Sequence, residues 1–100
     1  MENITAQAVQ KIIDQTKYGE YDQYHEWSPS YSLSDKTVFL ENMLKDWERT
    51  EEEGKKLILQ FAKDLLKEAG KWNSVIIEKL ERYSQIPEIK EIYNHAGRKL

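Results

Sequence analysis

Apolar residues recur along the chain at intervals of three and four, the repeat of an α-helix rather than of a strand. In the clearest example, Leu40, Met43, Leu44 and Trp47 fall at positions i, i+3, i+4 and i+7. Four other segments carry similar stripes, and none shows the strict alternation of a half-buried strand, so the pattern predicts five helical segments. The other stripes are Ala8, Val9, Ile12, Ile13 and Thr16; Leu57, Ile58, Phe61, Ala62, Leu65, Leu66 and Ala69; Ile76, Ile77, Leu80 and Tyr83; and Ile86, Ile89, Tyr93, Ala96 and Leu100.

Capping residues suggest where the first two helices begin. Side chains of Asn, Ser, Thr and Asp satisfy free amide groups at helix N-termini. We expect the first helix from about Ile4 to Thr16, capped by Asn3 or Thr5, and the second to start with Ser34 as its N-cap.

A capping box predicts the start of the third helix. Thr50 is followed three residues later by Glu53, the spacing in which the two side chains cap each other's backbone amides. Acid-before-base pairs four residues apart support the same helix. These pairs are Glu51–Lys55 and Glu52–Lys56.

The alternative is one long helix from Ser34 to Ala69. The apolar stripe of that helix would be interrupted at Glu51 and Gly54, so two separate helices are favoured.

Glycine and proline mark the later boundaries. Gly70 suits the position just after a helix, and Pro87 suits the first position of the last helix. Asn73 or Ser74 can cap the helix between them. Short connections favour antiparallel neighbours, which predicts an all-α compact bundle of four to five helices. We expect one domain over 1–100, with the first helix in 1–17, an irregular segment at 18–33 and the main bundle at 34–100.

Composition limits the possible functions. The chain has 100 residues, 39% of them hydrophobic, no cysteine, and a formal net charge of −3. Disulfides and thiolate chemistry are therefore excluded, and the charge suits neither a DNA mimic nor a general nucleic-acid binder. The sequence shows no transmembrane run and no secretory signal at its start, so a cytoplasmic location is expected.

The irregular segment at 18–33 is unusually aromatic, because it holds nearly half of the chain's aromatic residues, interleaved with acids. Tyrosine and tryptophan are enriched at protein interfaces. We therefore predict a partner-binding surface here, with the acids suited to a basic partner. Two alternatives are a lid that packs on the chain's own apolar surface and a ligand site. The predicted binding residues are Tyr18, Tyr21, Tyr24, Trp27 and Tyr31.

Metal binding and catalysis find little support in the sequence. The chain has two histidines, His25 three residues after Asp22 and His95 four residues after Glu91, and neither belongs to the Glu-x-x-His pattern of di-metal bundles. No nucleophile elbow, phosphate-binding loop or dinucleotide fingerprint is present. We predict no metal, no cofactor and no enzymatic activity.

Two further partner classes are weaker. Lysines on one side of the third helix could follow a phosphate backbone, and the last two helices have helix-turn-helix dimensions, but acids flank both features. The three-four spacing of the last stripe also resembles a short coiled-coil seam that could pair two copies of the chain. Internal packing and a solvated charged face explain the same patterns more simply. The lysines are Lys56, Lys63, Lys67 and Lys71.

The sequence therefore predicts a small protein-binding module without chemistry of its own, of the inhibitor, immunity or adaptor type, which occludes a surface of another protein. The alternatives are a nucleic-acid-binding regulator and a structural homo-oligomer.

Overall fold

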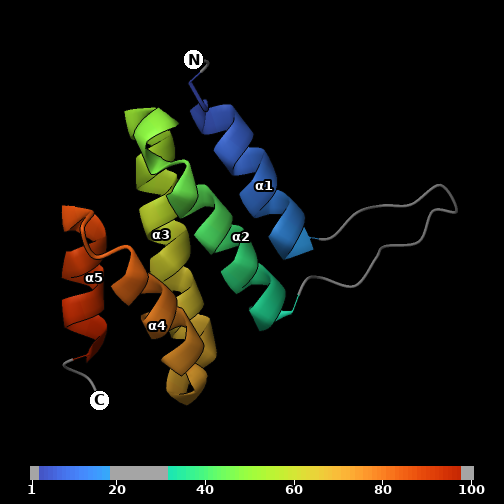
Figure 1. The fold of residues 1–100 in the computed structure, drawn as a ribbon. Coiled ribbons are helices and arrows are strands. Elements are labelled where there is room, and N and C mark those ends of the chain that lie inside the picture. The colour runs from blue at the N-terminus through green and yellow to red at the C-terminus, as the bar shows by residue number, and fades with distance from the viewer. Residues whose placement is uncertain (1–2, 19–31, 98–100) are drawn as a thin grey trace, which may run out of the picture.

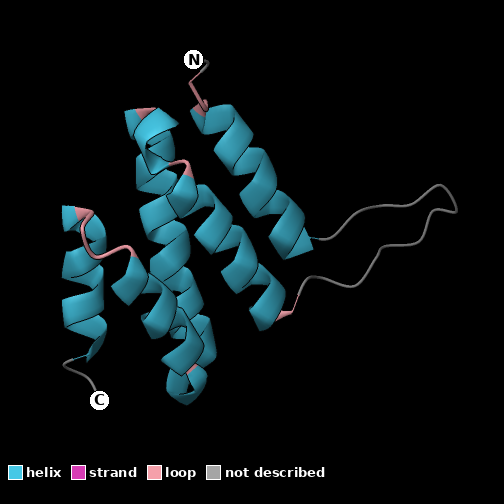
Figure 2. Cartoon of the chain, in the orientation of Figure 1, coloured by secondary structure: helices cyan, strands magenta, loops and turns pink. Residues whose placement is uncertain are grey.

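The computed structural model describes residues 3–18 and 32–97, and these ranges form five α-helices (Figure 1). The all-α prediction is confirmed. No strand occurs in the described ranges, where the connections between helices are short (Figure 2). The helices are α1 (Ala6–Tyr18), α2 (Leu33–Lys45), α3 (Glu52–Ala69), α4 (Ser74–Arg82) and α5 (Pro87–Gly97), with 3₁₀ turns at Trp47–Arg49 and Gly70–Trp72.

Each helix runs antiparallel to the one before it, as the colour sequence in Figure 1 shows. The longest helix, α3, is central because it contacts all four of the others. On one side of the molecule α1 and α2 pack on α3, and on the other side α4 and α5 pack on each other, with α2 also meeting α4.

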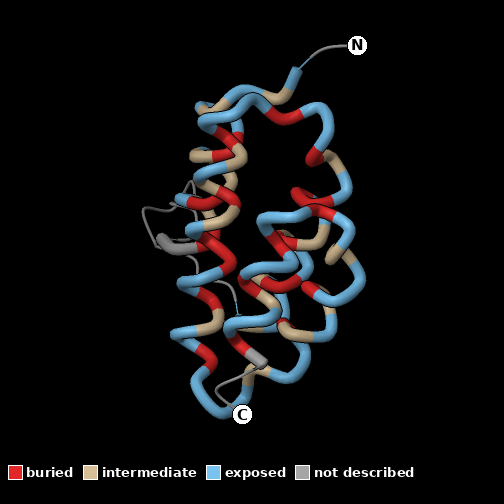
Figure 3. Tube along the Cα trace, turned by 90° about the vertical axis from the view of Figure 1, so that its left-hand side faces the viewer, coloured by how far each residue is buried: buried red, intermediate tan, exposed pale blue. Residues whose placement is uncertain are grey.

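The core lies on the inward stripe of each helix, where buried positions recur between exposed ones (Figure 3). Three buried threonines are accommodated because each hydroxyl donates a hydrogen bond to a backbone carbonyl of the preceding turn. Among the described residues, the buried apolar side chains are Val9, Ile13, Leu40, Met43, Leu44, Trp47, Ile58, Phe61, Ala62, Leu65, Ala69, Ile76, Leu80, Ile86, Ile89, Ile92 and Ala96.

Three predicted boundaries are confirmed. The second and third helices are separate, because the chain turns at Trp47–Arg49 and is extended at Thr50. Gly70 ends α3 with a positive φ of 55°, a conformation that glycine adopts without steric cost, and its N–H donates to the Leu66 carbonyl. Pro87 is the first residue of α5.

The predicted caps of α2 and α3 are wrong. Ser32, not Ser34, caps α2: its hydroxyl accepts a 3.2 Å hydrogen bond from the Asp35 amide, and Ser34 lies within the first turn. The Thr50–Glu53 capping box does not form, because the Thr50 hydroxyl donates to the Asp46 carbonyl at 2.8 Å instead. The N-cap of α3 is Glu51, without a side-chain capping bond.

The start of α1 and the ion pairs of α3 also differ from expectation. The first helix begins at Ala6 and extends to Tyr18, with the Thr5 hydroxyl accepting from the Ala8 amide at 3.1 Å, so Thr5 rather than Asn3 caps it. Asn73 has the N-cap position of α4 but makes no side-chain capping bond. In α3 the acids pair with lysines three residues ahead instead of the predicted four, at Glu52–Lys55 (3.5 Å) and Glu53–Lys56 (3.1 Å).

Candidate functional site

The N-terminal residues fix the position of α1 beside the turn between α2 and α3. The Ile4 amide donates to the Arg49 carbonyl at 2.7 Å, and the Ile4 carbonyl accepts from the Glu51 amide at 2.9 Å. The Glu51 carboxylate accepts a further bond from the Ala6 amide at 3.3 Å, at the positive end of the α1 dipole. This engagement explains why Glu51 does not form the predicted pair with Lys55.

Close packing brings the start of α1 against α3. A Cβ on buried Gly54 would lie 2.8 Å from Thr50 Cγ2, closer than Cβ atoms approach in proteins, and 3.2 Å from Val9 Cγ2, a tight contact. The absence of a side chain at Gly54 therefore permits the approach. Gly54, which interrupts the apolar stripe in the sequence, is therefore the position at which α1 contacts α3.

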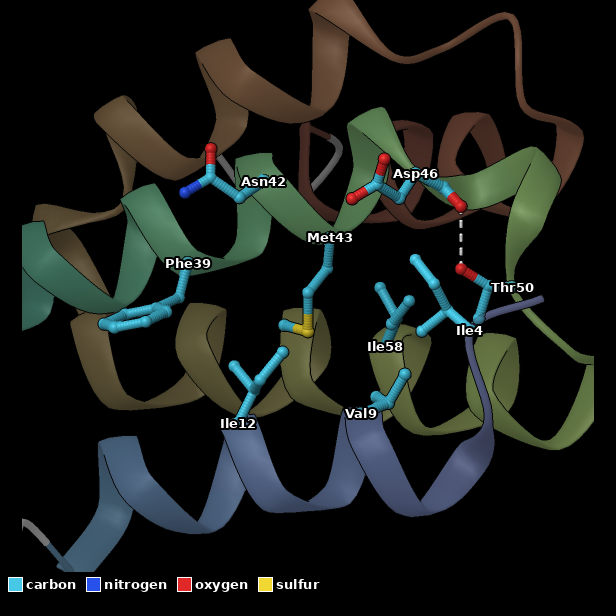
Figure 4. Close-up of a pocket in the computed structure, with 9 residues that line it drawn as sticks. All are labelled: Ile4, Val9, Ile12, Phe39, Asn42, Met43, Asp46, Thr50 and Ile58. Carbon is cyan, nitrogen blue, oxygen red and sulfur yellow. Dashed lines mark hydrogen bonds between the residues drawn. The ribbon is translucent and has the colours of Figure 1, made fainter. Parts of the chain in front are cut away.

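Although α1 and α2 both pack on α3, they do not close on each other, and a half-open apolar groove of about 210 Å³ remains between them (Figure 4). In this view Ile12 rises from α1 toward Met43 of α2, and Val9 rises from α1 toward Ile58 of α3. Residue Ile58 of α3, fully buried, is at the base. The complete lining is Ile4, Val9, Ile12, Phe39, Asn42, Met43, Asp46, Thr50 and Ile58.

The polar groups of the groove lie along its α2 edge and at its end. Asn42 is exposed, and the Asp46 carboxylate is 3.5 Å from the guanidinium of Arg49. The Thr50 hydroxyl is bonded to the Asp46 carbonyl (Figure 4). In the part of the chain that the structure describes, no buried side-chain nitrogen or oxygen lacks a hydrogen-bond partner. The groove therefore has an apolar interior with polar groups at its edge.

A cavity of about 150 Å³ is enough to hold benzene, whereas sites for drug-sized ligands run from about 300 to 1,000 Å³. At about 210 Å³ the groove fits one aromatic or branched aliphatic side chain. That size and lining suit recognition of a protein side chain better than binding of a cofactor.

At the opposite edge of α2, an ion pair joins this helix to α4. Lys79 of α4 lies 2.7 Å from the Glu41 carboxylate, and Lys45 lies 3.9 Å from it. The hydrogen bond from Lys79 holds the pKa of Glu41 below its usual range. Burial raises the pKa of Tyr83, and the Glu41 carboxylate adds to the rise.

The predicted aromatic site lies almost wholly outside the described residues. Tyr18 is the last residue of α1, and this helix together with α2 leads into and out of the segment. The remaining four positions, Tyr21, Tyr24, Trp27 and Tyr31, lie outside the described ranges.

The other sequence candidates are separate from the groove. All four lysines of the stripe are exposed, and Lys56 is paired with Glu53. The last stripe packs inside the chain, since Ile86, Ile89 and Ala96 are buried. In the described ranges no three His, Asp or Glu residues are grouped to hold a metal ion, and no helix is long and apolar enough to cross a membrane.

The groove was not predicted from the sequence, and neither were the roles of Ile4, Phe39 and Asn42. One signal was present: Phe39 lies four residues before Met43, and this pair widens the apolar stripe of α2 toward α1. The stripe alone does not reveal that the widened edge stays open.

Comparison of the chain with protein-family models, with curated protein sequences and with solved structures found no match. The arguments for function therefore rest on the residues and their geometry.

Proposed function

We propose that this chain is a small protein-binding module that acts by occluding a surface of another protein, as inhibitors, immunity proteins and adaptors do. The observation that carries the proposal is the groove between α1 and α2, which is apolar, half open and the size of a single side chain. Interfaces concentrate their binding energy in a few anchors that fill such pockets.

The sequence supplies the second support. The aromatic segment follows α1 and precedes α2 in the sequence, and these two helices provide most of the groove walls. Aromatic side chains provide rigid contact area at low entropic cost, and an apolar pocket provides a place for a partner's anchor. The interleaved acids suit a partner with basic groups near its binding surface, where they favour fast association.

The test begins with capture of partners from native lysate by the immobilised chain, with nuclease-treated controls and mass spectrometry. Asn42→Arg places a long charged side chain at the groove edge, and Asn94→Arg makes the same change at an exposed position on α5. We expect the first variant to lose the partner and the second to keep it, with both retaining wild-type melting temperatures. Equal capture by the two variants would contradict a role for the groove, and capture that disappears with nuclease treatment would favour a nucleic-acid partner.

A further inference from the structure

A second surface lies at the corner between α3 and α4, away from the groove. The Trp72 side chain is 73% exposed, and Val75, three residues later, is 55% exposed. Exposed single apolar residues are common, but an indole exposed to this extent keeps a large rigid ring in water. The Lys71 ammonium lies 5.5 Å from the centre of the Trp72 ring, a cation–π contact that adds positive charge to the corner.

Lysines extend this corner along α3. Lys63 and Lys67 are exposed and one helical turn apart, and Lys71 follows in the turn after the helix. Several other described lysines, among them Lys36, Lys55, Lys56 and Lys79, are paired with carboxylates. No such pair occurs for Lys63, Lys67 or Lys71 among the described residues.

The nearest acids on α3 are engaged on another side of the helix. Glu68 pairs with Lys36 of α2 at 3.1 Å, and Asp64 accepts a hydrogen bond from Gln60 at 2.9 Å. Both acids line a small depression on the α2 side, together with Lys36 and Phe61. The three lysines therefore keep uncompensated positive charge beside an exposed indole.

We infer that this surface, defined by Lys63, Lys67, Lys71, Trp72 and Val75, binds an acidic polypeptide segment that carries an apolar side chain. Carboxylates of the segment pair with the lysines, and its apolar side chain packs on the indole and Val75. The surface is distinct from the groove, so the inference does not depend on the proposed function.

A polypeptide fits better than a nucleic acid. Single-stranded nucleic acids also use basic grooves with stacking aromatics. However, the apolar side chain of Val75 suits a protein side chain, and the chain's net charge of −3 opposes a long polyanion.

The test is fluorescence anisotropy with a labelled peptide of glutamate and leucine, a matched peptide of lysine and leucine, and a short oligothymidylate. We expect the acidic peptide alone to bind, with an affinity that falls as salt rises. Trp72→Ala and the triple change Lys63→Gln, Lys67→Gln, Lys71→Gln should each raise its Kd by about tenfold, as loss of an interface anchor does.

Matched controls use exposed residues elsewhere. Val38→Ala removes another exposed apolar side chain, and the double change Lys11→Gln, Lys90→Gln removes charge from α1 and α5. Neither should shift Kd by as much as twofold, and all variants should keep the wild-type melting temperature because the changed side chains are exposed. The inference is overturned if the acidic peptide does not bind, if the triple variant binds it as well as the wild type does, or if the oligothymidylate binds more tightly through these residues.

Discussion

The two edges of α2 are built differently. Toward α4, the carboxylate of Glu41 meets Lys79 at 2.7 Å, and the buried Leu80 lies one residue further along α4. Toward α1, the described residues form no cross-helix ion pair, and the apolar groove remains open. The edge toward α4 is therefore a helix–helix contact that includes an ion pair. The edge toward α1 is an apolar surface that another side chain can still contact.

The difference follows from how α1 is held. Backbone bonds at Ile4 and the close approach at Gly54 fix the start of α1 to the α2–α3 turn and to α3. In the described part of the chain α1 and α2 each contact α3 more extensively than they contact each other, so α3 beneath them sets much of their separation. An open apolar edge can thus persist beside a well-packed core.

The largest expected change in the free energy of unfolding comes from truncating a buried side chain beside α2, and its size should differ between the two sides of this helix. Leu80→Ala removes a fully buried side chain on the closed side and should lower the free energy of unfolding by about 2–5 kcal/mol. Met43→Ala enlarges the groove, where solvent can enter, and should cost only about 2 kcal/mol, at the lower end of that range. Urea unfolding of both variants measures the difference. Equal costs, or a larger cost for Met43→Ala, would show that the groove side is packed as tightly as the closed side.

A smaller effect is expected where α1 meets α3. Gly54→Ala places a methyl group 2.8 Å from Thr50 Cγ2, and we expect a net loss of about 1 kcal/mol, because overpacking outweighs the better helix propensity of alanine. Thr50→Ser keeps the hydroxyl that bonds the Asp46 carbonyl and removes the clashing methyl group. The double variant should therefore recover most of the lost stability. Unchanged stability in Gly54→Ala alone would mean that α1 is not held this closely.

The helices were largely predictable from the sequence, and their ends and mutual spacing were not. The stripe of Leu40, Met43, Leu44 and Trp47 is buried as predicted, because period alone determines which face of a helix is apolar. Ser32 and Ser34 are the same residue type two positions apart, so the sequence does not distinguish them as caps, and in the structure Ser32 accepts the capping bond while Leu33 packs against the core. The close approach of α1 to α3 depends on Gly54, and this role is a tertiary contact that leaves no local pattern.

The charged edge of α2 gives a pH-dependent prediction. Because the pKa of Glu41 is lowered in the folded chain, its carboxylate contributes stability at neutral pH. This contribution is complete above the unfolded pKa of a glutamate and is lost as pH falls through the lowered folded value. We expect Glu41→Gln to be slightly less stable at pH 7 and to show a shallower loss of stability in acid, measured by urea unfolding from neutral to strongly acidic pH. Parallel pH profiles for the variant and the wild type would rule out this contribution.

The smallest expected change in stability concerns the aromatic segment. Replacing Trp27 and Tyr24 together with alanine should leave the melting temperature close to that of the wild type, because the buried apolar positions of the five helices already form a continuous core. The same variant should lose partner capture, since these rings are the proposed anchors. Replacing the exposed Val38, which belongs to neither proposed binding surface, with alanine is the control, expected to change neither quantity. A large drop in melting temperature for the double variant would instead show that the rings pack in the chain's own interior. The open edge of α2 would then bind side chains of this chain and not those of a partner.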